Sequence, residues 1–67
     1  MSVARVTEII ASSKQGWEDA ARQGLSRAAK TLRGITGMEI LRQNAKIEKG
    51  RIVEYRVNCR ITFILEK

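Results

Sequence analysis

Several kinds of chemistry are excluded by what this 67-residue chain lacks. It contains no histidine, no proline and a single cysteine, Cys59. Without histidine, the commonest general base near neutral pH is missing. One thiol cannot form an intramolecular disulfide, and it cannot hold a structural zinc ion without further ligands. A domain of this length buries only about 60% of the surface that its unfolded chain exposes, so we expect oligomerisation to stabilise it.

No catalytic or nucleotide-binding motif replaces the missing groups. The five glycines form neither a GxGxxG nor a GxxxxGK[ST] pattern, so no phosphate-binding loop is indicated. Glu39, Glu54 and Glu66 are isolated carboxylates on predicted strands, and no nucleophile stands beside a base. We therefore predict that the protein is not an enzyme.

Charge and hydropathy restrict the partners and the location. Thirteen basic and seven acidic residues give a net charge of +6, which attracts anions such as nucleic acid. The basic residues are scattered and the aromatic residues are few, so a small nucleic-acid-binding module remains an alternative that rests on charge alone. No apolar run approaches the roughly 18 residues of a membrane span, and charged residues interrupt the N-terminal segment. We predict a cytoplasmic protein that does not enter a membrane.

The clearest pattern is the alternation of apolar and polar residues from 54 to 65. Such alternation places the two kinds of side chain on opposite faces of an extended strand. The apolar face would carry Tyr55, Val57, Cys59, Ile61, Phe63 and Leu65, and the polar face Glu54, Arg56, Asn58, Arg60 and Thr62. On the polar face, the row of Arg56, Asn58 and Arg60 could bind anions or pair with acidic groups of a neighbouring subunit. We expect Cys59 to be a core residue because it lies on the apolar face.

The rest of the chain predicts one helix and two further strands. The β-branched segment from Val3 to Ala11 predicts a first strand. Apolar residues then recur at helical spacing, which predicts a helix from Lys14 to Arg33 with an N-cap at Ser12-Ser13 and Gly34 as the residue that ends it. The apolar stripe comprises Trp17, Ala20, Ala21, Leu25, Ala28, Ala29 and Leu32.

A second strand is expected from Met38 to Ile47, joined to the long strand by residues 48–51. Gly50 can adopt the positive φ that a short hairpin loop needs. The fold class is therefore α+β, with the order β-α-β-β, a three-stranded antiparallel sheet packed on one helix, and one domain over residues 1–67. Two sheet edges and much of one face are left for other subunits. We accordingly expect self-assembly.

Several segments, in this order and spacing, resemble the dodecin family over nearly the whole chain. They are the strand end Ala11-Ser12-Ser13, the helix start from Gly16 to Ala21, the helix end from Ala28 to Arg33, and the strand residues 54–57 and 63–66. The resemblance implies twelve subunits that assemble into a hollow shell. It also implies storage of riboflavin or FMN, held by a stacking tryptophan on the second strand and a hydrogen-bonding glutamine on the third.

The four positions equivalent to that flavin site are Gly37, Met38, Asn44 and Arg56. The family's Asp-Trp-Phe-Glu run aligns with residues 36–39, so Gly37 replaces the stacking tryptophan and Met38 the following phenylalanine. Arg56 replaces the glutamine, and Asn44 replaces an arginine late in the second strand. Stacking on an aromatic side chain contributes roughly 1 to 3 kcal/mol per ring, so flavin binding should be weak or absent.

Two alternatives follow from the same resemblance. Dodecins that lack the tryptophan resemble calcium-binding members, so this chain could form a calcium-binding shell or a purely structural one. The carboxylates available for calcium are Glu8, Glu39, Glu48, Glu54 and Glu66, and their spacing does not match an EF-hand loop. The metal-binding residues are therefore left unassigned, and the partners expected are further copies of the chain with a small-molecule or ionic ligand.

Overall fold

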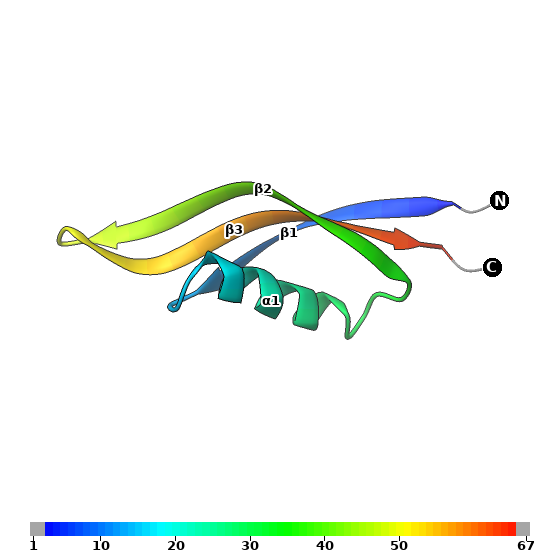
Figure 1. The fold of residues 1–67 in the computed structure, drawn as a ribbon, viewed down its shortest axis with the longest axis horizontal. Coiled ribbons are helices and arrows are strands. Elements are labelled where there is room, and N and C mark those ends of the chain that lie inside the picture. The colour runs from blue at the N-terminus through cyan, green and yellow to red at the C-terminus, as the bar shows by residue number, and fades with distance from the viewer. Residues whose placement is uncertain (1–2, 66–67) are drawn as a thin grey trace.

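Three strands and one helix follow one another in the expected β-α-β-β order. The computed structural model describes residues 3–65, and its elements are β1 (Ala4–Ser13), α1 (Trp17–Ala28), β2 (Ile35–Glu48) and β3 (Arg51–Ile64). The strands form one antiparallel sheet in the order β1-β3-β2, so β3 is central. The helix lies across one face of the sheet (Figure 1). The predicted α+β fold is confirmed.

Alternation along β3 produces the core. Val57, Cys59 and Ile61 are buried on the face towards the helix, where Val57 and Cys59 form a cluster with Ala20. Arg56, Asn58 and Arg60 alternate with them and so project from the other face, which we call the open face. Burial raises the pKa of the Cys59 thiol, as expected for a cysteine that serves as a small core residue.

The helix contacts β1 and β3 through its smallest residues. Ala20 and Gly24 are the helical residues that are buried, whereas Leu25, which the apolar stripe placed towards the sheet, is 37% exposed. A Cβ atom at Gly24 would lie 2.9 Å from the Cβ of Ala11 and 3.2 Å from Cδ1 of Ile9. The absence of a side chain at Gly24 therefore sets how closely α1 approaches β1.

The helix begins later than the sequence pattern predicts. Ser13 belongs to β1, and the N-cap is Gly16, which offers no side-chain cap. The hydroxyl of Ser13 instead donates to Asp19 at 2.5 Å and accepts a hydrogen bond from the backbone N–H of Gln15 at 2.9 Å. The hydrogen bond from Ser13, followed by that from Gln23 and the charge of Arg22, lowers the pKa of Asp19. The predicted cap at Ser12-Ser13 was therefore wrong, although Ser13 does connect β1 to the first turns of the helix.

The helix also ends earlier than predicted, at Ala28 instead of Arg33. Backbone N–H groups of Lys30 and Thr31 donate to the carbonyls three residues before them, which tightens the chain into a turn. Gly34 is therefore not the residue that ends the helix. Its φ of 74° and its carbonyl, which accepts a hydrogen bond from the N–H of Ile64 at 2.9 Å, position the chain for β2.

Strands β2 and β3 form a long hairpin that extends beyond the helix and beyond the end of β1 (Figure 1). Lys49 and Gly50 have φ values of 53° and 76°, as a two-residue type I′ turn requires, so the predicted role of Gly50 is confirmed. The described chain measures 52 × 19 × 13 Å, and Ile47 and Ile52 near the turn are 57% and 49% exposed. The sheet is thus much longer than the single helix that covers it.

The structure also bears on membrane spanning. Within residues 3–65, α1 is too short and too polar to cross a bilayer as a helix.

The contact at Gly24 predicts a selective sensitivity to side-chain size. Gly24→Val should lower the free energy of unfolding by about 1 to 3 kcal/mol, because the new methyl groups would overlap Ala11 and Ile9. The control is Gly37→Val, since a Cβ atom at Gly37 meets no atom within 4 Å. Urea denaturation at one fixed protein concentration measures both. Equal stability of Gly24→Val and the wild type would contradict the packing described.

Candidate functional site

The open face of the sheet carries a network of charged side chains that joins all three strands. Arg60 of β3 lies 3.6 Å from a carboxylate oxygen of Glu8 on β1 and 3.4 Å from one of Glu39 on β2. These three residues are cross-strand neighbours in the sheet register, and each is partly exposed. The sequence analysis considered acidic partners for Arg60 only on another subunit, yet Glu8 and Glu39 lie within this chain. The strand register, which the sequence does not state, is what pairs them.

Asn44 and Arg56, two of the four positions that the sequence predicts to correspond to the family's flavin site, lie side by side on this face. They are directly opposite one another in the β2–β3 register. The side-chain amide of Asn44 donates to Oδ1 of Asn58 at 3.5 Å, and the guanidinium of Arg56 lies 3.0 Å from Glu54. Hydrogen bonds from Ser12 and then Arg56 lower the pKa of Glu54, so this carboxylate stays ionised beside Arg56. Arg56 is therefore already paired within its own strand.

Gly37 lies far from that pair. Its register partner is Thr62, six residues along β3 from Arg56, which corresponds to roughly 20 Å at about 3.3 Å per residue. Gly37 is exposed and its surroundings are open. Positions 37 and 56 are predicted to correspond to the family's stacking and hydrogen-bonding residues, and within one subunit they are too far apart for their side chains to meet on one small ring.

Met38 lies on the opposite face. It is paired with Ile61, and it packs against the core cluster of Ala20, Val57 and Cys59. Since Ile61 and Arg56 are an odd number of residues apart on β3, their side chains point to opposite faces. The structure thus brings Asn44 and Arg56 together, and it places Gly37 and Met38 elsewhere.

The carboxylates proposed for calcium are similarly dispersed. Over residues 3–65, no three side chains among aspartate, glutamate and cysteine are close enough to hold a metal ion. Glu8 and Glu39 share Arg60, Glu54 pairs with Arg56, and Glu48 lies 3.6 Å from Lys46. Glu66 lies outside the described residues. The four of these carboxylates that the structure describes therefore each have a basic partner within the subunit.

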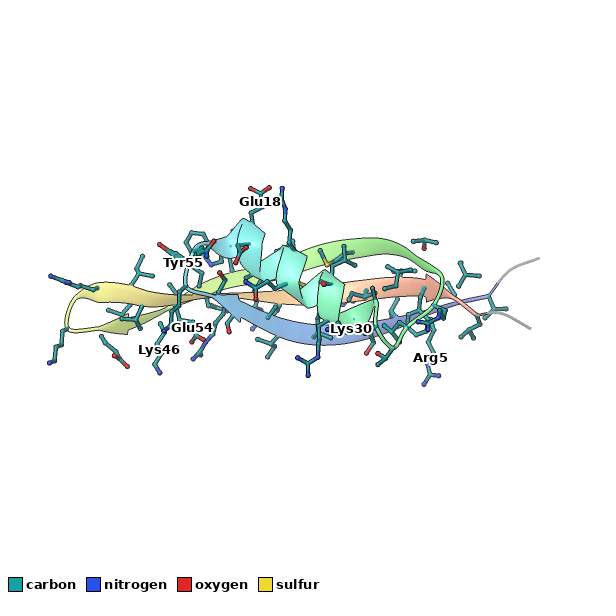
Figure 2. The ribbon with its side chains drawn as sticks, turned by 90° about the horizontal axis from the view of Figure 1, so that it is seen from below. Arg5, Glu18, Lys30, Lys46, Glu54 and Tyr55 are labelled. Carbon is teal, nitrogen blue, oxygen red and sulfur yellow. The ribbon has the colours of Figure 1, made fainter. Side chains whose placement is uncertain are left out.

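Trp17 connects the start of the helix to both strands of the hairpin. Its indole N–H donates to the backbone carbonyl of Asn44 at 2.8 Å, and its ring lies 4.8 Å from that of Tyr55 at an interplanar angle of 50°. The ring also packs against the core cluster. Through these contacts Trp17 anchors the helix to the sheet. The hydrogen bond also fixes the backbone of β2 at Asn44. Figure 2 shows Tyr55 beside the start of the helix.

Comparison with known proteins decides the family. The family model for dodecins matches residues 3–66, which is nearly the whole chain. The chain belongs to the dodecin family. The family assignment made from the sequence is confirmed.

Individual dodecins resemble this chain over nearly its full length. The dodecin of Thermus thermophilus is 32% identical over 65 residues, covering 97% of this chain and 94% of its own. The solved dodecin of Streptomyces coelicolor superimposes with a TM-score of 0.95, at 32% identity and with 98% and 94% of the two chains covered. The calcium dodecin of Mycobacterium tuberculosis is 29% identical over 94% of this chain and 89% of its own. Its structure, described as having a novel calcium-binding site, superimposes with a TM-score of 0.85 over 97% and 93% of the chains.

The contacts of Trp17 predict that its main role is structural. Trp17→Ala should lower the free energy of unfolding by about 3 kcal/mol, because it removes the ring from the core. Trp17→Phe keeps a ring but loses the hydrogen bond to Asn44, and it should lower the free energy by only about 0.5 to 1.5 kcal/mol. Thermal and urea denaturation at a fixed protein concentration distinguish the two. A Trp17→Ala protein as stable as the wild type would show that the ring does not anchor the helix.

Proposed function

We propose that this dodecin assembles into a dodecameric shell that binds a small ligand without transforming it, and that its affinity for flavins is low. The observation that carries the proposal is the roughly 20 Å separation between Gly37 and Arg56 along the sheet. A ligand that uses both positions must therefore contact more than one copy of the chain. Binding of such a ligand then depends on assembly.

Exposed apolar side chains support the assembly. Val6 and Ile10 project from the open face of β1 and are 54% and 70% exposed, and Ile40 of β2, on the other face, is 42% exposed because α1 lies mainly over β1 and β3. Among the described residues, the buried apolar side chains are limited to Ala20, Val57, Cys59 and Ile61. So small a core and so much uncovered apolar surface favour burial against further copies.

The chemistry of the two substituted positions supports weak flavin binding. Gly37 offers no side chain to stack on an isoalloxazine ring, and stacking of this kind contributes roughly 1 to 3 kcal/mol. Arg56 has donors only, so it cannot accept a hydrogen bond from a ring N–H as a glutamine carbonyl would. Its pairing with Glu54 further reduces its availability. Each change acts against the flavin site of the family.

Calcium is the second candidate ligand, because one of the similar proteins is a calcium dodecin. The carboxylates of a single chain do not converge within residues 3–65, so any calcium site would have to combine residues of neighbouring subunits. The pairing of Glu8 and Glu39 with Arg60 opposes such a site, because each carboxylate would have to give up its ion pair with Arg60 to bind calcium. We therefore rank calcium below a small organic ligand.

The proposal predicts that restoring two side chains restores flavin affinity. The wild type should purify colourless and quench riboflavin fluorescence weakly. Gly37→Trp with Arg56→Gln should bind riboflavin at least about tenfold more tightly, the equivalent of roughly 1.4 kcal/mol. The open surroundings and ordinary φ of Gly37 can accommodate the indole. Fluorescence titration of riboflavin into each protein provides the measurement.

A matched control distinguishes the effect of aromatic stacking from the effect of added side-chain volume. Gly37→Leu with Arg56→Gln adds apolar volume without an aromatic face, and it should bind riboflavin more weakly than the tryptophan variant. A yellow wild-type protein with nanomolar flavin affinity would contradict the proposal. So would a tryptophan variant that binds no more tightly than the wild type while keeping its assembly.

A further inference from the structure

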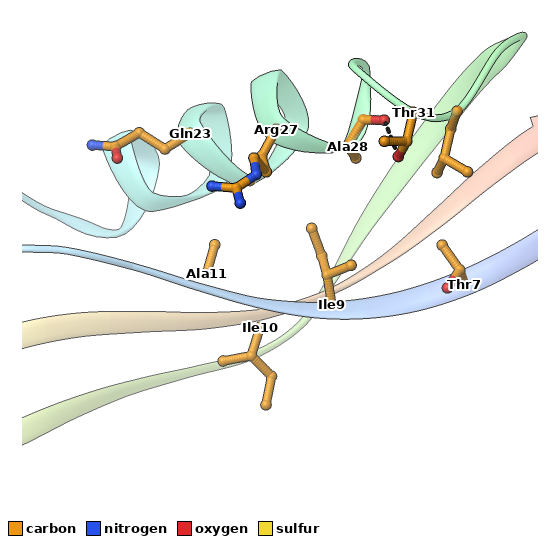
Figure 3. Close-up of a pocket in the computed structure, with 10 residues that line it drawn as sticks. Thr7, Ile9, Ile10, Ala11, Gln23, Arg27, Ala28 and Thr31 are labelled. Atoms are coloured by element: carbon orange, nitrogen blue, oxygen red, sulfur yellow. Dashed lines mark hydrogen bonds between the residues drawn. The ribbon is translucent and has the colours of Figure 1, made fainter.

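A groove between α1 and the edge strand β1 lies on the helix side of the sheet, away from Asn44 and Arg56. Its volume is about 540 Å³, within the roughly 300 to 1,000 Å³ of typical small-molecule sites. The lining is largely apolar, with Ile9 and Ala11 from β1, Ala28 from the end of the helix and Leu32 from the connection that follows it. Figure 3 shows Ile9 and Ala11 pointing towards the helix across this space and Ile10 pointing away.

Arg27 supplies a positive charge at the groove. Its side chain lines the space, and within residues 3–65 no carboxylate lies within 4.0 Å of its guanidinium. The groove is also lined by the polar side chains of Thr7, Gln23 and Thr31, which carry no charge, and two of them are already bonded. Gln23 donates to Asp19 at 2.6 Å, and the Thr31 hydroxyl donates to the carbonyl of Ala28 at 3.5 Å. Arg27 is therefore the group best placed to bind an incoming anion.

Further basic residues stand close to this end of the molecule. Lys30 lies three residues after Arg27, in the turn that follows the helix, and Arg5 precedes Thr7 of the groove by two residues on the same face of β1. Neither has an acidic partner in the described part of the chain, which contrasts with Arg56 and Arg60 on the open face. Some of the net charge of +6 is thus gathered beside an apolar groove.

We propose that this groove binds an amphipathic organic anion. The apolar body lies on Ile9, Ala11 and Leu32, and a carboxylate or phosphate group pairs with Arg27. An apolar body suits the largely apolar lining of the groove, and a guanidinium binds either oxyanion through two parallel hydrogen bonds. This site is distinct from the ligand positions on the open face, so it does not depend on the function proposed above.

The test compares ligands that differ only in the head group. Decanoate, decyl phosphate and decanol would be titrated against the assembled protein by calorimetry, below the micelle concentrations of the two anions and the solubility limit of decanol. Decanoate or decyl phosphate should bind at one site per subunit, and decanol should bind at least about tenfold more weakly because it carries no charge. The stronger of the two anions identifies the preferred head group.

Two charge-matched variants locate the site. Arg27→Gln should weaken binding of the preferred anion by roughly tenfold and leave that of decanol nearly unchanged. Arg22→Gln removes the same charge from the same helix, but Arg22 is paired with Glu18 outside the groove, so binding should stay as in the wild type.

Three results would overturn the proposal. They are equal binding of decanol and the anions, equal losses in the two variants, and no binding to the assembled protein. The last result would indicate that a neighbouring copy of the chain occupies the groove. Gly37→Trp with Arg56→Gln should bind the anion as the wild type does, so failure of either proposal can be recognised separately.

Discussion

Strand β3 is the central strand, and the other elements lie where they pair with its two edges and cover its two faces. Its backbone pairs with β1 on one edge and with β2 on the other. Its apolar side chains require cover on one face, which α1 provides over Val57 and Cys59. Its basic side chains require partners on the other face, which Glu8, Glu39 and Glu54 provide. Beyond the helix, where the hairpin continues, isoleucine side chains remain exposed to solvent.

Local patterns were sufficient for the order and type of the elements, because each has its own period or turn chemistry. The alternation of residues 54–65 identified β3, and Gly50 marked the hairpin turn. The ends of the helix were placed less well, because Ser13 and Gly34 resemble capping residues yet form their bonds with Asp19 and Ile64. Gly24 was not recognised as the contact residue, since its importance depends on the approach of Ala11 from a distant strand.

In the candidate site, too, contacts between residues distant in sequence could not be predicted from local patterns. Asn44 and Arg56 are neighbours, as an alignment to the family could suggest, but the distance to Gly37 depends on the register of two long strands. The pairing of Arg60 with Glu8 and Glu39 likewise joins residues that are up to 52 positions apart in sequence. Such contacts could not be read from composition or spacing. They determine which charges are already satisfied and which, like Arg27, remain available among the described residues.

We expect further copies of the chain to cover the apolar surface that α1 leaves exposed. Native mass spectrometry of the wild type at micromolar concentration tests this expectation most directly. We expect one dominant species with a mass about twelve times the 7.6 kDa of the single chain. A monodisperse, fully folded monomer under the same conditions would contradict it.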